Sequence, residues 1–254
     1  MKKLALSQFL YLGASLRFLQ DAEVGMPIHS WGRVLYNLDH FAAEIQRLNL
    51  RVTSSVFNLK QLHVLTTELK TSNEDAKLTE EQAKKVRVSM EVVRATLLAE
   101  ADNLPAYMLS EKRFEVARLV TSPATFLHEH TFTKLPPIAQ SDIQEAGRCI
   151  AFDTPTAAGF LLLRATERAL RAYYSRYFKV KKDEKLMWGP MITRLRNKSK
   201  KSRPNKILLD HLDNIRFNFR NPTDHPEKTY GIDEVQDLFS LVADVLNRVA
   251  AEFP

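Results

Sequence analysis

The strongest constraint on the fold is the spacing of apolar residues near the C-terminus of the chain. They recur every three or four residues, at Val235, Leu238, Val242, Leu246 and Val249. That spacing places all five side chains on one face of an α-helix, whereas a half-buried strand would need strict alternation. The segment is therefore predicted to be an amphipathic helix that buries one face in a core.

Other parts of the chain carry the same helical spacing. Thr79 followed by two glutamates is a helix start signal, and Val86, Met90, Val93 and Leu97 then form one stripe. Ser141-Asp142 and Asp153-Thr-Pro-Thr156 are two more start signals, the second with a proline early in the helix. Helices are predicted over residues 29–48, 55–69, 79–98, 141–152, 156–178, 186–196 and 204–220.

No stretch alternates convincingly, and only seven glycines occur in 254 residues, so the predicted fold class is all-α. Residues 1–104 are predicted to form a helical N-terminal region with an undetermined regulatory or recognition role. Downstream of this region, the paired prolines at 136–137 are expected to end any helix and to stiffen the connection. Residues 105–254 are predicted to form a helical bundle, because their amphipathic helices are joined by mostly short turns.

Composition excludes several classes of protein. Neither G-x-G-x-x-G nor G-x-x-x-x-G-K occurs, and the single Cys149 rules out an internal disulfide framework or a cysteine-based zinc site. The N-terminal apolar run is broken by Ser7 and Gln8, which argues against export, and no run is long enough to span a membrane. A cytoplasmic protein without membrane attachment is expected.

Positive charge is concentrated in one segment. Residues 176–206 hold 12 lysines and arginines against two acidic residues, although the net charge of the whole chain is only +7. This basic segment is either a solvated loop or a patch that faces phosphates, since clustered cations bind polyanions by releasing counterions. Its candidate RNA contacts are Lys181, Lys182, Arg194, Arg196, Lys198, Lys200, Lys201 and Arg203.

The stretch NFRNPTDHP, residues 218–226, combines a helix end with reactive side chains. Pro222 has no N–H and disfavours helical dihedrals at Asn221, so the preceding helix is predicted to end at Arg220 or Asn221. The following turn is expected to bring His225 back towards Arg220.

Two further charged residues are expected near this stretch. Arg216 precedes Arg220 by one helical turn, and two arginines at that spacing are compatible if an anion lies between them. Glu167 interrupts an apolar stripe, so it either needs a cationic partner, Arg216 or Arg220, or lies at the edge of the bundle.

The sequence Arg220-Asn221-x-x-x-His225 resembles the signature of HEPN domains, which is an arginine, a polar residue and then a histidine after a short gap. The flanking segments DIQEAGRCIAFDTPTAAGFLLLRATERAL and KTYGIDEVQDLFSLVADVL are also similar to bacterial HEPN proteins. The resemblance covers roughly residues 106–251. Pro222 departs from the pattern, because it makes the spacer of the motif a rigid turn.

The resemblance implies a metal-independent ribonuclease that acts as a homodimer, with both copies of the motif in one cleft, as in toxin and phage-defence systems. Arg220, Asn221 and His225 would be the catalytic residues, with Glu167, Arg216 and Tyr230 in support. His225 can accept or donate a proton near neutral pH, and a guanidinium suits the charge that develops on phosphate. Asn221 would hold the geometry of the cleft. No cofactor is expected, and cleavage would leave a 2′,3′-cyclic phosphate.

Alternatives remain at this stage. Many HEPN domains have lost activity, so the protein is alternatively a non-catalytic RNA- or nucleotide-binding or scaffold module. A third interpretation is an antitoxin-like or regulatory partner whose N-terminal region does the recognition. Tyr230 either offers its hydroxyl to the site or packs at the start of the last helix. His128 and His130 are interpreted as loop residues rather than a metal pair, and His211 as structural.

Overall fold

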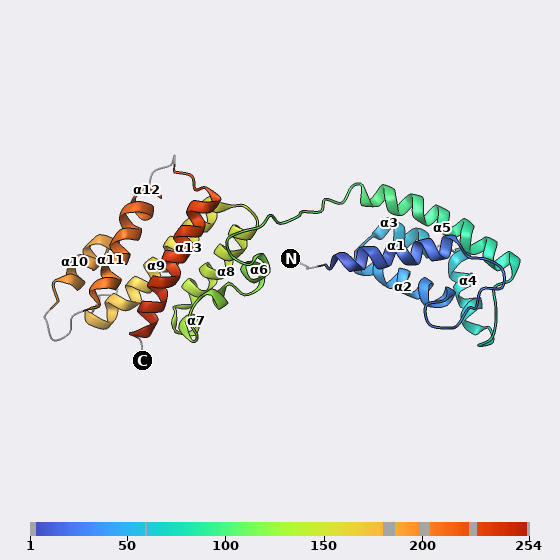
Figure 1. Ribbon diagram of the computed structural model, residues 1–254, viewed down its shortest axis with the longest axis horizontal. Helices are drawn as coiled ribbons and strands as arrows, with labels where there is room; N and C mark the ends of the chain where they lie inside the picture. Colours follow the sequence, from blue (N-terminus) through green and yellow to red (C-terminus); the bar gives the residue numbers. More distant parts are fainter. Residues whose placement is uncertain (1–3, 59, 180–185, 199–203, 224–227, 253–254) are drawn as a thin grey trace. The chain divides into compact units, whose positions relative to one another are not determined.

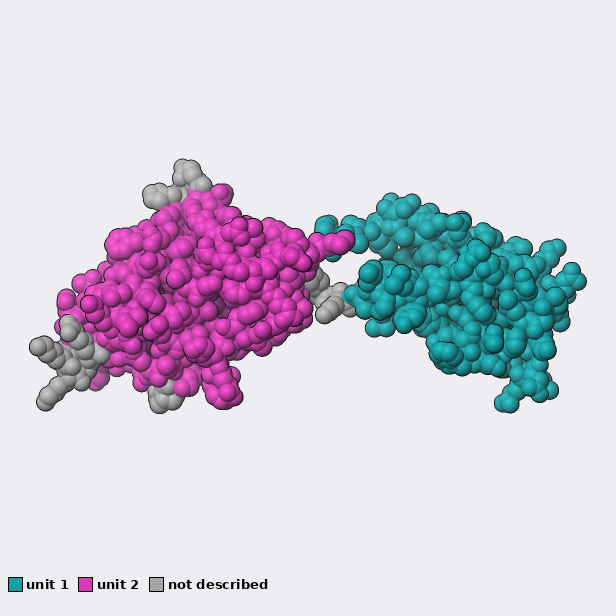
Figure 2. All heavy atoms as spheres, viewed as in Figure 1, with its two compact units in different colours: residues 1–107 teal, residues 108–254 magenta. Residues whose placement is uncertain are grey.

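The computed structural model describes residues 4–58, 60–179, 186–198, 204–223 and 228–252, and all of its extended regular elements are helices (Figure 1). Within these ranges there is no strand, only an isolated β-bridge between Pro27 and Lys77. The predicted all-α fold class is therefore confirmed. The chain divides into two compact units, Met1–Tyr107 and Met108–Pro254 (Figure 2), while the predicted boundary lies after residue 104.

The first unit has its own hydrophobic core, which includes the predicted stripe of Val86, Met90, Val93 and Leu97. Thr79 caps the helix that carries this stripe, because its hydroxyl accepts the Gln82 N–H at 3.2 Å. The helices are α1 (Leu6–Gln20), α2 (Val34–Arg47), α3 (Arg51–Phe57), α4 (Lys60–Thr71) and α5 (Glu80–Ala101).

Two helices of the first unit differ from their predicted ranges. The helix predicted from residue 29 begins only at Val34, because Gly32 has φ +72°, a left-handed conformation that cannot continue into a right-handed helix. The helix predicted over residues 55–69 is instead two helices, and α3 ends with its C-cap at Asn58. Apolar spacing does not detect such a break, because both pieces contribute to the same core.

The second unit is a bundle centred on α9 (Pro155–Tyr177), which packs against both α8 (Pro137–Ala151) and α13 (Ile232–Ala251) (Figure 1). All five stripe residues of α13 are completely buried, as the sequence predicts. The remaining elements are α6 (Val116–Thr121), the 3₁₀ helix η1 (Pro123–Phe126), α7 (Thr131–Lys134), α10 (Trp188–Arg196), α11 (Lys206–Ile215), the π-helical segment η3 (Arg216–Arg220) and α12 (Asn221–Thr223).

The start of α8 was predicted wrongly. The helix begins at Pro137, four residues before the predicted cap, because a proline in the first turn lacks only an N–H that would have no partner there. Asp142 is consequently inside the helix, where it is 2% exposed and binds Arg164 at 2.5 and 2.8 Å. Asp142 therefore holds α9 against α8.

Three further features concern exposure and apolar surface. Cys149 is half-buried against the core. Phe160 of α9 is 54% exposed and does not belong to the buried face of that helix. Among the described helices, none combines the length and the apolar composition that crossing a bilayer requires.

Candidate functional site

The helix that carries Arg220 does not stop where the sequence predicts. It passes through a π-helical segment, Arg216–Arg220, and continues as α12 to Thr223, so Pro222 lies within it. In this segment the Asn221 N–H bonds the Arg216 carbonyl, five residues back. A proline inside an α-helix loses one backbone bond and presses on the carbonyl four residues earlier. The wider π turn relieves that conflict, so the prediction of a stop at residue 220 or 221 was wrong.

Tyr230 anchors the end of this helix. Its hydroxyl lies 2.5 Å from the Thr223 hydroxyl and 3.1 Å from the Phe219 carbonyl oxygen, and its ring stacks on Phe219. Burial raises the pKa of Tyr230, so the phenol stays protonated. The side chain lines neither of the two pockets described below, and it packs at the start of the last helix, the second of the two roles considered for it.

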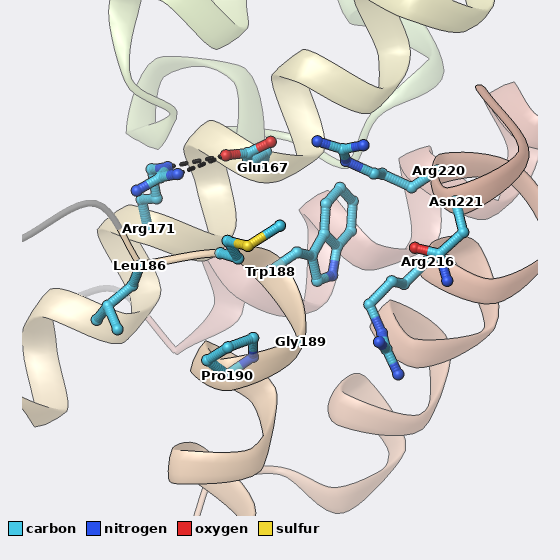
Figure 3. A pocket seen from close by; sticks show the side chains of 10 residues that line it. Glu167, Arg171, Leu186, Trp188, Gly189, Pro190, Arg216, Arg220 and Asn221 are labelled. Carbon is cyan, nitrogen blue, oxygen red and sulfur yellow. Dashed lines mark hydrogen bonds and ion pairs between the residues drawn. The ribbon is translucent and has the colours of Figure 1, made fainter. Parts of the chain in front are cut away.

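Arg216, Arg220 and Asn221 line one pocket of about 280 Å³ (Figure 3). Its other walls come from α9 and from the start of α10. Three arginines and one glutamate face it, a net balance of +2, beside several apolar side chains. The complete lining is Glu167, Arg171, Leu186, Met187, Trp188, Gly189, Pro190, Arg216, Arg220 and Asn221.

Glu167 lies between Arg171 and Arg220 in this pocket (Figure 3). Its partner is Arg171, one turn along α9, which donates from Nε at 3.0 Å and from Nη2 at 2.6 Å. Both bonds go to Oε1, and no described residue donates to Oε2. The expected partners Arg216 and Arg220 share the pocket with Glu167, but Glu167 forms its ion pair with Arg171.

Arg216 is paired with Asp213. Its Nε and Nη2 each lie 3.0 Å from the same Asp213 oxygen, and its guanidinium lies 4.1 Å from the centre of the Phe217 ring. Asp213 also binds Arg196 of the basic segment at 3.0 Å. This carboxylate therefore links the basic segment to the pocket.

Trp188, which the sequence analysis did not select, forms part of the pocket wall. It is 4% exposed, and among the described residues nothing accepts a hydrogen bond from its indole Nε1–H. Leaving a buried donor unpaired costs about 1–3 kcal/mol, so such a group in a native structure calls for an explanation. A tryptophan at a helix start carries no sequence signal for this role, since its position fits the core equally well.

A second, smaller hollow of about 160 Å³ shares Glu167 and Arg220 with the first. Phe160, Leu163, Arg164 and Thr223 complete its lining. The two hollows therefore meet at Glu167 and Arg220.

The described members of the basic segment make contacts within the protein. Arg194 donates to the Tyr174 hydroxyl at 3.1 Å, and Arg196 binds Asp210 at 2.6 Å in addition to Asp213. Lys198 donates to the Tyr177 carbonyl at 2.7 Å. The other candidates, Lys181, Lys182, Lys200, Lys201 and Arg203, lie outside the described residues, as does His225.

The remaining histidine candidates lie apart from the pocket lining. His211 Nδ1 lies 2.6 Å from an Asp244 oxygen, which also accepts from Arg248 at 2.8 Å. His128 and His130 lie in the loop before α7, as predicted. Within the described residues, no three His, Cys, Asp or Glu side chains are grouped so that they could hold a metal ion.

Comparisons of the chain with protein-family models, with curated proteins and with solved structures find no match.

Proposed function

We propose that the protein is a metal-independent RNA endonuclease of the HEPN type, whose catalytic residues are Arg220, Asn221 and His225. The observation that carries this proposal is the placement of Arg220 and Asn221. Both line a pocket with a positive balance of charge, and residue 225 follows two residues after the described end of α12. An arginine and an amide at such a site are suited to a phosphodiester.

The chemistry needs one group to move protons and another to stabilise charge. In the proposed reaction the ribose 2′-oxygen attacks the adjacent phosphorus while losing its proton, and the 5′-oxygen leaves as it gains one. His225 would serve one of these transfers, because the pKa of an imidazole lies close to neutral pH. Arg220 would stabilise the charge that builds on the phosphate oxygens. The products are a 2′,3′-cyclic phosphate and a 5′-hydroxyl.

A second copy of the chain is part of this proposal. In the HEPN arrangement two motifs share a cleft, so one protomer would supply the second histidine. The basic segment would hold the RNA backbone beside that cleft without reading its sequence.

The alternative is a non-catalytic RNA- or nucleotide-binding module. One observation favours it: Arg196 and Arg216 are already held by Asp210 and Asp213, which reduces the charge they offer to a transition state. Such a module would still bind RNA in a salt-dependent way.

Incubating the purified protein with RNA in EDTA distinguishes these functions. We expect cleavage with 2′,3′-cyclic phosphate ends by the unmodified chain and none by His225→Ala, with His130→Ala as the matched control that retains activity. Cleavage that is equal in His225→Ala, or absent from every protein tested, would refute the catalytic proposal. Salt-sensitive RNA binding without product would instead support the binding module.

A further inference from the structure

The pocket beside Arg220 has features that a phosphodiester alone does not explain. A phosphate would use the guanidiniums, but Leu186, Met187 and Pro190 add an apolar wall, and Glu167 adds a carboxylate that would repel an anion next to it. A ligand that matches all three features has an anionic end, a flat apolar body and a hydrogen-bond donor. A nucleotide has all of these.

We propose that this pocket binds one nucleotide of the RNA, next to the phosphate that Arg220 contacts; the inference rests on the proposed function. The pocket volume, about 280 Å³, lies just below the roughly 300 Å³ at which pockets for drug-sized ligands begin, so it holds one nucleotide and not a longer segment.

The phosphate of this nucleotide lies on the side of Arg216 and Arg220. The planar guanidinium of arginine matches the geometry of two phosphate oxygens. Charge-assisted hydrogen bonds of this kind are stronger than hydrogen bonds between neutral groups. Trp188 also lines the pocket, but its indole Nε1–H is buried, so that N–H is not offered to the ligand.

The base lies against the apolar wall with its edge towards Glu167. Arg171 binds only Oε1, which fixes the carboxylate and leaves Oε2 able to accept from the ligand. A carboxylate oxygen pairs with an exocyclic amino group, such as N4 of cytosine, and repels a carbonyl at the same position. Cytosine and uracil differ there, so Glu167 discriminates between these two bases and favours cytosine over uracil.

Fluorescence titration tests this directly, because the chain has two tryptophans and Trp31→Phe leaves Trp188 as the sole reporter. CMP, UMP and cytidine are titrated into the Trp31→Phe, His225→Ala protein, in which cleavage cannot interfere. We expect a saturable change with CMP and an affinity for cytidine, which lacks the phosphate, that is at least tenfold weaker. UMP should bind several-fold more weakly than CMP.

Three substitutions assign the contacts. Arg216→Gln should weaken CMP binding about tenfold, as loss of one charge-assisted bond predicts. Arg148→Gln, at an exposed arginine of the same unit outside the pocket, should leave it unchanged. Glu167→Gln should reduce or reverse the preference for CMP, because an amide can donate to the uracil carbonyl. If Arg216→Gln does not fold, Arg216→Lys is the second variant. It keeps the positive charge but loses the paired N–H donors of the guanidinium, so it should still weaken CMP binding measurably.

Equal affinities for CMP and UMP, equal effects of Arg216→Gln and Arg148→Gln, or no saturable signal would each overturn the inference. Its failure is distinguishable from failure of the proposed function. RNA cleavage by the unmodified chain without nucleotide binding refutes only the inference. CMP binding without cleavage refutes only the nuclease.

Discussion

Gly159 lies where α9 meets the tyrosine that anchors the end of the Arg220 helix. A Cβ placed on Gly159 would lie 2.8 Å from Cε2 and 2.9 Å from Cδ2 of Tyr230. The ring cannot move aside easily, because it stacks on Phe219 and its hydroxyl is bound at the helix end. Gly159→Ala therefore overpacks a buried contact.

Two opposing effects set the size of the change. Replacing glycine by alanine within a helix stabilises it by about 1 kcal/mol, whereas overpacking a core costs about 1–3 kcal/mol. The expected outcome for Gly159→Ala is a loss of up to about 2 kcal/mol. Gly13 in α1 is the matched control, since a Cβ there meets nothing within 4 Å, and Gly13→Ala should gain about 1 kcal/mol.

Amide hydrogen exchange measured by mass spectrometry is the suitable assay, because it reports the opening free energy of each unit separately. Peptides from α9 should exchange faster in Gly159→Ala, and peptides from α1 more slowly in Gly13→Ala. Tyr230→Phe removes the hydroxyl that anchors the ring, so the penalty of Gly159→Ala should be smaller in that background. If Gly159→Ala stabilises α9 as much as Gly13→Ala stabilises α1, the contact between Gly159 and Tyr230 is refuted.

Three further predictions concern titration and the division of the chain. Burial opposes ionisation of Asp244, but hydrogen bonds from Arg248 and His211 lower its pKa below the usual 3.8. The ionised Asp244 carboxylate stabilises the fold at pH values above its unfolded pKa, and this stabilisation is lost as the pH falls through its lower folded pKa. Asp244→Asn should therefore reduce the loss of unfolding free energy between pH 5 and 2, measured in urea titrations, by no more than about 1 kcal/mol. Burial, followed by a hydrogen bond to Glu252, raises the pKa of Tyr173 above its usual 10.0. Stability should therefore fall as pH rises above about 10, where the unfolded tyrosine ionises, and Tyr173→Phe should lessen that fall in the same titrations. A fragment of residues 108–254 should keep its helical circular dichroism and cooperative unfolding, since each unit has its own core; a fragment that lacks both would contradict this division.

The sequence predicted those parts of the fold that depend on repeated local spacing. The stripe of α13, the stripe of α5 and the Thr79 cap all need only residues within one or two turns of each other, and all are present in the structure. The start of α8 was missed because two valid start signals competed. The helix begins at Pro137, and Asp142 therefore lies inside it, where it accepts from Arg164 of the next helix.

The candidate site was predictable only in part. The proximity of Arg216 and Arg220 follows from helical spacing, and both line one pocket. The partner of Glu167 could not be decided from sequence, because a local arginine one turn away competed with two arginines from another helix. Trp188 was not identified at all, since an unpaired indole N–H is a property of its surroundings and not of its residue type.

The π-helical segment has a consequence for how insertions and deletions would act here. Each residue of an α-helix advances the direction of the side chains by about 100°, so one extra residue in a turn changes the phase of everything that follows. Before the segment, Leu208, Leu212 and Ile215 face the core. After it, the new phase points Thr223 inward to meet Tyr230 while Asn221 still lines the pocket. Removing Asn218 would let the backbone return to a regular α-helix, but it would turn either the anchor or the pocket residues away. The number of residues in this segment therefore determines the geometry of the site as much as their identity does.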